Sequence, residues 1–127
     1  ESKMRKILNF GHTIGHAIES YSMTKKHRLL HGNAIAIGMI TESFISNKLY
    51  NFPIEKVKKI KNHLIKLFGL EKFTRNEIDS IIKLIKHDKK NTHGKVNFVL
   101  LKNLGEPIFD VNVKDELIFK SFEFYLN

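Results

Sequence analysis

The sequence contains no cysteine, no long apolar run and comparatively few acidic residues. Without cysteine there can be neither disulfides nor thiolate ligands, so any metal must be held by imidazole, carboxylate or water. No apolar stretch approaches the roughly 20 residues that span a bilayer, and no short apolar segment follows a basic N-terminus as in a signal peptide. We therefore expect a soluble, cytoplasmic protein with no membrane partner.

The scarcity of acidic residues leaves the chain strongly basic. Asp and Glu number 13 against 22 Lys and Arg, a formal charge of +9. Such a balance is typical of nucleic-acid-binding proteins. However, most lysines, such as Lys58 and Lys59, fall on the polar faces of predicted helices, and no helix-turn-helix, aromatic stacking platform or zinc-finger spacing occurs. We expect no nucleic acid, and a non-catalytic basic helical module remains the non-enzyme alternative.

The length of 127 residues suits one domain with a single core. The chain begins at Glu1 rather than methionine and enters patterned sequence at once, which we interpret as a fragment of a longer protein. Domain 1–127 is therefore predicted to be one helical unit.

The pattern of apolar residues predicts mainly helix. A proline at 53 and a glycine at 69 bound one amphipathic stripe, and Thr74 with Glu77 forms a T-x-x-E capping box. The run from Leu29 is apolar on nearly all sides and predicts a central buried helix. The fold class is mainly α with a small β-hairpin. The expected helices are 4–21, 29–50, 53–69, 74–88 and 113–126, and the expected strands are 95–102 and 107–113.

Three of the seven histidines stand in a suggestive setting. On a helix, residues four apart lie about 6 Å from each other on one face, so His12 and His16 can share a site. Exposed histidine pairs at this spacing also arise by chance. Here small residues flank the pair in GHTIGH, and His31 opens HGNAIAIGM at the predicted start of the buried helix. Catalytic zinc commonly has three protein ligands and one open position, but the sequence alone leaves the third ligand undetermined.

Two further clusters carry groups that bind carboxylate or phosphate oxygens. Arg5 and Asn9 lie about two turns and one turn before His12 if the helix is continuous. Asp88, Lys89 and Lys90 follow the fourth predicted helix. Taken alone, the first pair is equally compatible with an exposed helix face, and the triplet with a solvated helix end.

Three blocks of sequence occur together in order: ESKMRKILNFGHTIGHAIE at 1–19, LLHGNAIAIGM at 29–39, and DKK at 88–90 before VNFVLL. Jointly they resemble the 3-dehydroquinate synthase family. In that family this region is the helical C-terminal domain, packed against an N-terminal NAD-binding domain with the active site between them. Asn33 stands where the family usually has glutamate, and Lys3 where it usually has glycine.

The resemblance implies a role for each candidate residue. His12 and His31 would be metal ligands, a glutamate of the absent N-terminal domain would be the third, and His16 would be an acid/base residue. Glu1 would be a second catalytic group, a carboxylate for proton transfer. The implied substrate-binding residues are Arg5, Asn9 and one of Lys89 and Lys90.

The implied reaction converts 3-deoxy-D-arabino-heptulosonate 7-phosphate to 3-dehydroquinate and phosphate, in the shikimate pathway of aromatic amino acid biosynthesis. Its cofactors would be zinc or cobalt and NAD, and the full-length enzyme would be a homodimer. A sister sugar-phosphate cyclase, such as 2-deoxy-scyllo-inosose synthase, is the enzyme alternative, with a metal-dependent polyol dehydrogenase more distant. The fragment alone is expected to fold without catalysing the reaction.

Overall fold

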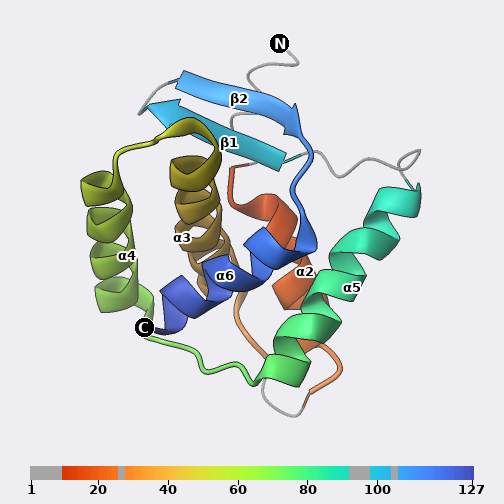
Figure 1. Cartoon of the computed structure of the whole chain (residues 1–127). Coiled ribbons are helices and arrows are strands. Elements are labelled where there is room, and N and C mark those ends of the chain that lie inside the picture. The colour runs from red at the N-terminus through yellow and green to blue at the C-terminus, as the bar shows by residue number, and fades with distance from the viewer. Residues whose placement is uncertain (1–9, 26–27, 92–97, 104–105) are drawn as a thin grey trace.

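The computed structural model describes residues 10–25, 28–91, 98–103 and 106–127, with the side chains of 88–91, 103, 109 and 110 left out of that description. Five described helices form most of the fold, and a small antiparallel hairpin lies across one end of them (Figure 1), which confirms the mainly α fold class. The helices are α2 (His12–Ser22), α3 (His31–Tyr50), α4 (Ile54–Phe68), α5 (Arg75–Asn91) and α6 (Asp115–Leu126), and the strands are β1 (Phe98–Asn103) and β2 (Glu106–Val111).

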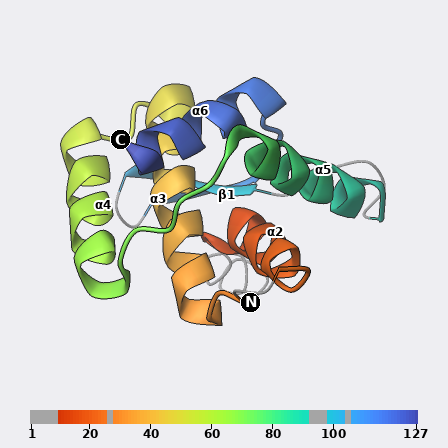
Figure 2. The same cartoon turned by 90° about the horizontal axis from the view of Figure 1, so that it is seen from below.

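Helix α3 is the centre of the fold. It packs against α2, α4, α6 and β1, and α2 in turn packs against α5. Figure 1 shows α4 on one side of α3, α6 crossing it, and α2 and α5 on the other side; Figure 2 shows the same arrangement from below. Because α3 is covered from several directions, its buried residues point to all sides, as the run from Leu29 predicted.

The boundaries of α4 and the start of α5 follow the local signals. Pro53 directly precedes α4, and Gly69 ends it with a φ of 82°. At the start of α5, the Thr74 N–H donates to the Glu77 carboxylate at 2.8 Å, and the Glu77 N–H donates to the Thr74 hydroxyl at 3.2 Å. The predicted capping box is therefore confirmed.

The end of α5 differs from the prediction. We expected the helix to stop near residues 87–88, but it continues to Asn91. Lys89 and Lys90 therefore lie within the final turn of α5 and not after the helix.

The prediction of one continuous helix over residues 4–21 is wrong. The helix begins at His12, because Gly11 adopts a left-handed conformation with φ 85°. A Cβ atom on Gly38 of α3 would stand 1.9 Å from the Gly11 carbonyl oxygen, so the two backbones touch at this point. The left-handed glycine lets the chain turn into α2 while remaining against α3.

The hairpin and α6 close the remaining sides of the core. Strands β1 and β2 pair antiparallel, with Phe98 opposite Val111 and Leu100 opposite Ile108. The Leu101 N–H donates to the Ser46 hydroxyl at 2.8 Å, which ties the hairpin to α3. Among the described residues, no helix combines the length and the apolar character needed to cross a bilayer.

Candidate metal and proton-transfer site

Helices α2 and α3 bring three histidines together. His12 and His16 stand one turn apart on α2, and His31 is the first residue of α3. The centroids of the His12 and His16 rings are 5.0 Å apart, and the His31 ring lies 6.1 Å from His12 and 6.2 Å from His16. The predicted clustering of these residues is therefore observed, whereas their roles remain predictions. We call His12, His16 and His31 the histidine site.

The side chain of His12 fits a metal ligand. Its Nδ1 atom is buried, and no group of the described chain forms a hydrogen bond with it. Burial lowers the pKa of His12, and the neighbouring His16 and His31 lower it further. The neutral imidazole is the form that binds a metal. A buried, unpaired and readily deprotonated ring nitrogen fits a divalent ion.

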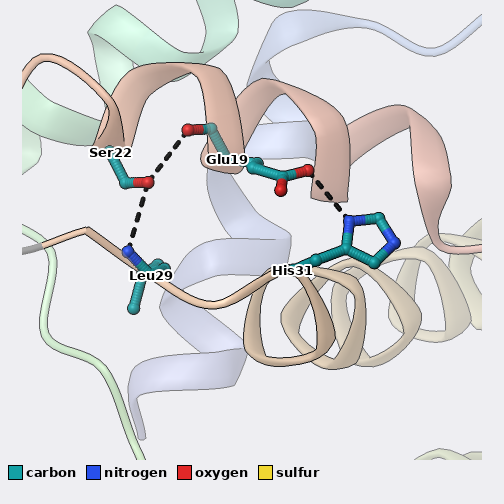
Figure 3. A network of polar contacts seen from close by, with 4 residues as sticks. All are labelled: Glu19, Ser22, Leu29 and His31. Atoms are coloured by element: carbon teal, nitrogen blue, oxygen red, sulfur yellow. Dashed lines mark hydrogen bonds and ion pairs between the residues drawn. The ribbon is translucent and has the colours of Figure 1, made fainter.

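His31 is oriented by a carboxylate. Its Nδ1 lies 3.0 Å from Oε1 of Glu19, near the other end of α2 (Figure 3). In the neutral ring, Nδ1–H donates to Glu19 and the Nε2 lone pair remains available. Histidine ligands of metals commonly donate their second nitrogen to a carboxylate in this way, which fixes the ring and its tautomer.

The chain between α2 and α3 is held close to this contact. The Ser22 hydroxyl donates to the Glu19 carbonyl at 2.9 Å and accepts the Leu29 N–H at 3.3 Å (Figure 3). These bonds link the end of α2 to the segment that leads into His31. The position of His31 near His12 is thus stabilised by the Glu19 contact of its side chain and by the Ser22 bonds of the chain that precedes it.

A second carboxylate lies beneath the start of α2. Glu42 on α3 is fully buried, and its two oxygens accept the N–H groups of Gly11 at 2.9 Å and of Ile14 at 3.0 Å. Burial raises the pKa of Glu42 to about 8, and the two backbone bonds act in the opposite direction. Glu42 holds the turn that immediately precedes His12.

Within the described part of the chain, no set of three His, Asp or Glu side chains is arranged to hold a metal ion. The division of ligands implied by the resemblance, in which His12 and His31 act with a third group outside this chain, stays a prediction.

Several predicted residues fall outside the description. Glu1, Arg5 and Asn9 precede the described residues, and the side chains of Lys89 and Lys90 are not described. The continuous helix on which the spacing of Arg5 and Asn9 from His12 was based is interrupted at Gly11.

The remaining histidines were predicted to be surface residues. His63 and His87 are exposed, whereas His27 and His93 are not among the described residues. The sequence reasoning assigned no role to Glu19 or Glu42. Glu19 stands within the GHTIGHAIE block, and Glu42 is the one acidic residue in the sequence 29–50; these were the available signals.

Comparison with known proteins identifies the family of this chain. The profile of the 3-dehydroquinate synthase C-terminal family matches residues 1–91. The chain belongs to this family. It is 42% identical over 125 residues to the 3-dehydroquinate synthase of Parabacteroides distasonis, covering 98% of this chain and 35% of that protein. It is 41% identical over 117 residues to that of Leptospira interrogans, covering 91% of this chain and 31% of that one.

Solved structures of sugar-phosphate cyclases share the fold. A 2-deoxy-scyllo-inosose synthase complexed with carbaglucose-6-phosphate, NAD⁺ and Co²⁺ superposes with a TM-score of 0.70 at 31% identity, over 91% of this chain and 32% of that one. The 2-epi-5-epi-valiolone synthase of Streptomyces hygroscopicus, with NAD⁺ and Zn²⁺, gives 0.75 at 19% identity, over 98% and 34%, and supports the fold alone. The chain spans about a third of the length of the relatives it matches.

Proposed function

We propose that this chain is the helical, metal-binding third of a 3-dehydroquinate synthase, acting in the cytoplasm as part of a homodimer. Domain 1–127 would pack against an N-terminal domain that binds NAD and supplies a glutamate ligand. The observation that carries the proposal is the histidine site: three imidazoles within 6.2 Å in a chain of this family, one with a buried unpaired nitrogen and one oriented by a carboxylate.

In this proposal His12 and His31 hold the metal, zinc or cobalt. When bound, the metal supplies charge stabilisation at the reacting oxygens, and NAD supplies the transient oxidation that the reaction needs. The environments of the two histidines differ. Burial lowers the pKa of His12, which favours its neutral form, whereas His31 is exposed and is oriented by Glu19.

His16 carries the proton-transfer role. Its side chain is exposed, one helical turn from His12, so it can face a substrate bound beside the metal. A positioned imidazole can both accept and return a proton. Glu1 is proposed as a second proton-transfer group.

The substrate is 3-deoxy-D-arabino-heptulosonate 7-phosphate, and its carboxylate and phosphate require cationic partners. Arg5, Asn9 and one of the lysines at 89 and 90 are the proposed contacts. The excess of lysine and arginine over acidic residues is consistent with an anionic substrate.

A chimera tests the proposal directly. This chain would replace the matching C-terminal part of the Parabacteroides distasonis synthase, and the parent enzyme would serve as the reference. We expect phosphate release from 3-deoxy-D-arabino-heptulosonate 7-phosphate at a rate within about tenfold of the parent. A folded, metal-loaded chimera without turnover would refute the proposed activity.

Single substitutions in the chimera separate the roles of the histidines. His12→Ala and His31→Ala should lose bound metal, as measured by elemental analysis, whereas His16→Ala should keep the metal and lose about 100-fold or more in kcat. His63→Ala, an exposed histidine on α4, is the matched control and should behave as the unmodified chimera. Equal loss of metal in all three variants would make His16 a ligand and would move the proton-transfer role elsewhere.

The sister reaction is the second candidate, because a 2-deoxy-scyllo-inosose synthase shares the fold at 31% identity. The curated relatives near 40% identity favour the first candidate. Glucose 6-phosphate offered to the same chimera distinguishes the two. Preferential turnover of glucose 6-phosphate would establish the sister reaction.

A further inference from the structure

The first turn of α2 has no side-chain cap of its own. Its N-cap residue is Gly11, which carries no hydrogen-bonding side chain, and no side-chain cap from a neighbouring residue is present. In an ordinary capping box, the N-cap side chain accepts the N–H three residues on, and a Glu or Gln at that later position accepts the N–H of the N-cap residue. In α2 these two positions are Gly11 and Ile14, and neither has a polar side chain.

Glu42 fulfils both halves of this arrangement from another helix. Its Oε1 accepts the N–H of Gly11 and its Oε2 accepts the N–H of Ile14. These are the two groups that a local capping box would satisfy. One carboxyl group, 28 to 31 residues away in sequence, thus replaces two missing side chains.

The position of Glu42 on α3 explains why it can reach. Gly38, one turn earlier on α3, lies directly against Gly11, with no room for a Cβ atom between the two. The start of α2 therefore rests on two consecutive turns of α3. His12 follows Gly11 directly, and His16 lies one turn further, while His31 belongs to α3 itself.

We propose that Glu42 is a positioning residue of the histidine site, which fixes the start of α2 on α3 and thereby the spacing of His12 and His16 from His31. This proposal rests on the proposed function of those histidines. It assigns Glu42 no contact with metal or substrate. Glu42 acts through the backbone of residues 11–14.

General stabilisation of the core is a poor explanation for Glu42. Burying a carboxyl group is unfavourable unless hydrogen bonds compensate, and an apolar side chain of similar size usually packs as well or better. What an apolar side chain cannot do is accept two N–H groups at once. Glu42 does accept two, since each of its carboxyl oxygens bonds to a different backbone N–H group.

Two substitutions and one control test the proposal in the chimera, which supplies the third proposed ligand. Glu42→Gln keeps the shape but offers one acceptor oxygen instead of two, and Glu42→Leu offers none. Ser43→Ala is the control. Ser43 is also fully buried on α3, but among the described residues its hydroxyl bonds only to the Ile40 carbonyl of the same helix, at 2.8 Å. Circular dichroism would establish that each variant is folded.

Two readouts report on position and not on overall stability. The first is backbone amide exchange, followed by NMR, together with through-space contacts between the His12 and His16 rings and the His31 ring. We expect Glu42→Gln to accelerate exchange at one of Gly11 and Ile14 by at least about tenfold beyond the rest of α2, and Glu42→Leu at both. Contacts to the His31 ring should weaken in both variants and persist in Ser43→Ala.

The second readout uses Co²⁺ alone as the probe, followed by its visible absorption. Substitution of residues behind metal ligands typically costs 10- to 100-fold in affinity. We expect a loss of about tenfold or more for Glu42→Gln and an altered spectrum, with little change for Ser43→Ala.

Exchange that rises uniformly along α2, with ring contacts and Co²⁺ affinity equal to those of Ser43→Ala, would overturn the proposal. An unsubstituted chimera that binds no Co²⁺ would instead count against the proposed metal site. In that case the amide exchange and ring contacts still decide whether Glu42 positions the histidines.

Discussion

The two sides of α3 make different kinds of contact with their neighbours. Toward α4 and α6 it meets aromatic side chains: Phe44 stacks on Phe124 with ring centroids 4.8 Å apart, in the neighbourhood of buried Phe122 and Tyr125. Toward α2 it meets backbone, at the contact between Gly38 and Gly11, and the bonds to Glu42. Side-chain burial is strong but tolerant of small shifts, whereas hydrogen bonds and backbone contact are directional. The histidine site lies on the side of α3 that faces α2, where the contacts are directional.

Removal of a large aromatic side chain should have the greatest effect on stability. Phe122 is fully buried and packs edge-on against Phe73, with the two ring centroids 5.6 Å apart. We expect Phe122→Ala to lower the free energy of unfolding by about 4 kcal/mol in urea titrations, because it leaves a cavity. Ring contacts among the three histidines should persist in the folded fraction. Phe68→Ala, at an exposed position, should cost less than about 1 kcal/mol. Loss of the histidine contacts in Phe122→Ala would contradict the idea that the aromatic side of α3 does not determine the positions of the histidine rings.

A single methyl group should disturb the other side. Gly38→Ala places a Cβ atom 1.9 Å from the Gly11 carbonyl oxygen, so α2 must move away. We expect a loss of about 3 kcal/mol, the upper part of the range for overpacking, together with weaker contacts between the His12 and His31 rings. Gly32→Ala is the control, since its nearest contact would be 3.4 Å away at Phe68. Equal stability of the two variants would show that the backbone contact is easily relaxed.

The pH dependence of stability should report on Glu42. Its pKa is raised from an ordinary 4.5 to about 8, so the unfolded chain releases this proton at lower pH than the folded chain does. The stabilisation is complete below pH 4.5 and is lost as pH rises toward 8, at about 1.4 kcal/mol per pH unit between these limits. Urea titrations of wild type and Glu42→Gln at several pH values isolate this slope. A difference between the two that is constant with pH would contradict the raised pKa.

The smallest effect on stability is expected at Glu19. Its contact with His31 involves a side chain that is 59% exposed, so Glu19→Gln should change the free energy of unfolding by less than about 1 kcal/mol. Metal binding should be more sensitive, with Co²⁺ affinity reduced about tenfold, because the carboxylate orients the ring. Glu123→Gln, at an exposed position on α6, is the control. An unchanged affinity would show that His31 needs no orienting partner.

Much of the fold was predictable because its signals are local. Pro53 and Gly69 bound α4, the Thr74 and Glu77 pair begins α5, and the apolar run from Leu29 becomes the central helix. Each signal involves groups a few residues apart, so it can be read from one stretch of sequence. The fold class and the hairpin followed from the same kind of pattern.

The features that escaped prediction depend on distant partners. The conformation of Gly11 is decided by its contact with Gly38, and a glycine in isolation is compatible with helix or turn. The structural role of Glu42 likewise depends on N–H groups 28 to 31 residues away in sequence. The clustering of His12 and His16 was predictable from helical spacing, whereas the bond between His31 and Glu19 required the packing of α2 on α3.

The backbone contact between Gly11 and Gly38 also determines which positions can vary. At an interface of side chains, one partner can shrink while the other grows, and many pairs are acceptable. Where main chain touches main chain, no compensating replacement exists, because any side chain is already too large. In a saturation-mutagenesis library selected for activity, positions 11 and 38 should therefore be as depleted of variants as the histidines, although neither residue carries a reactive group.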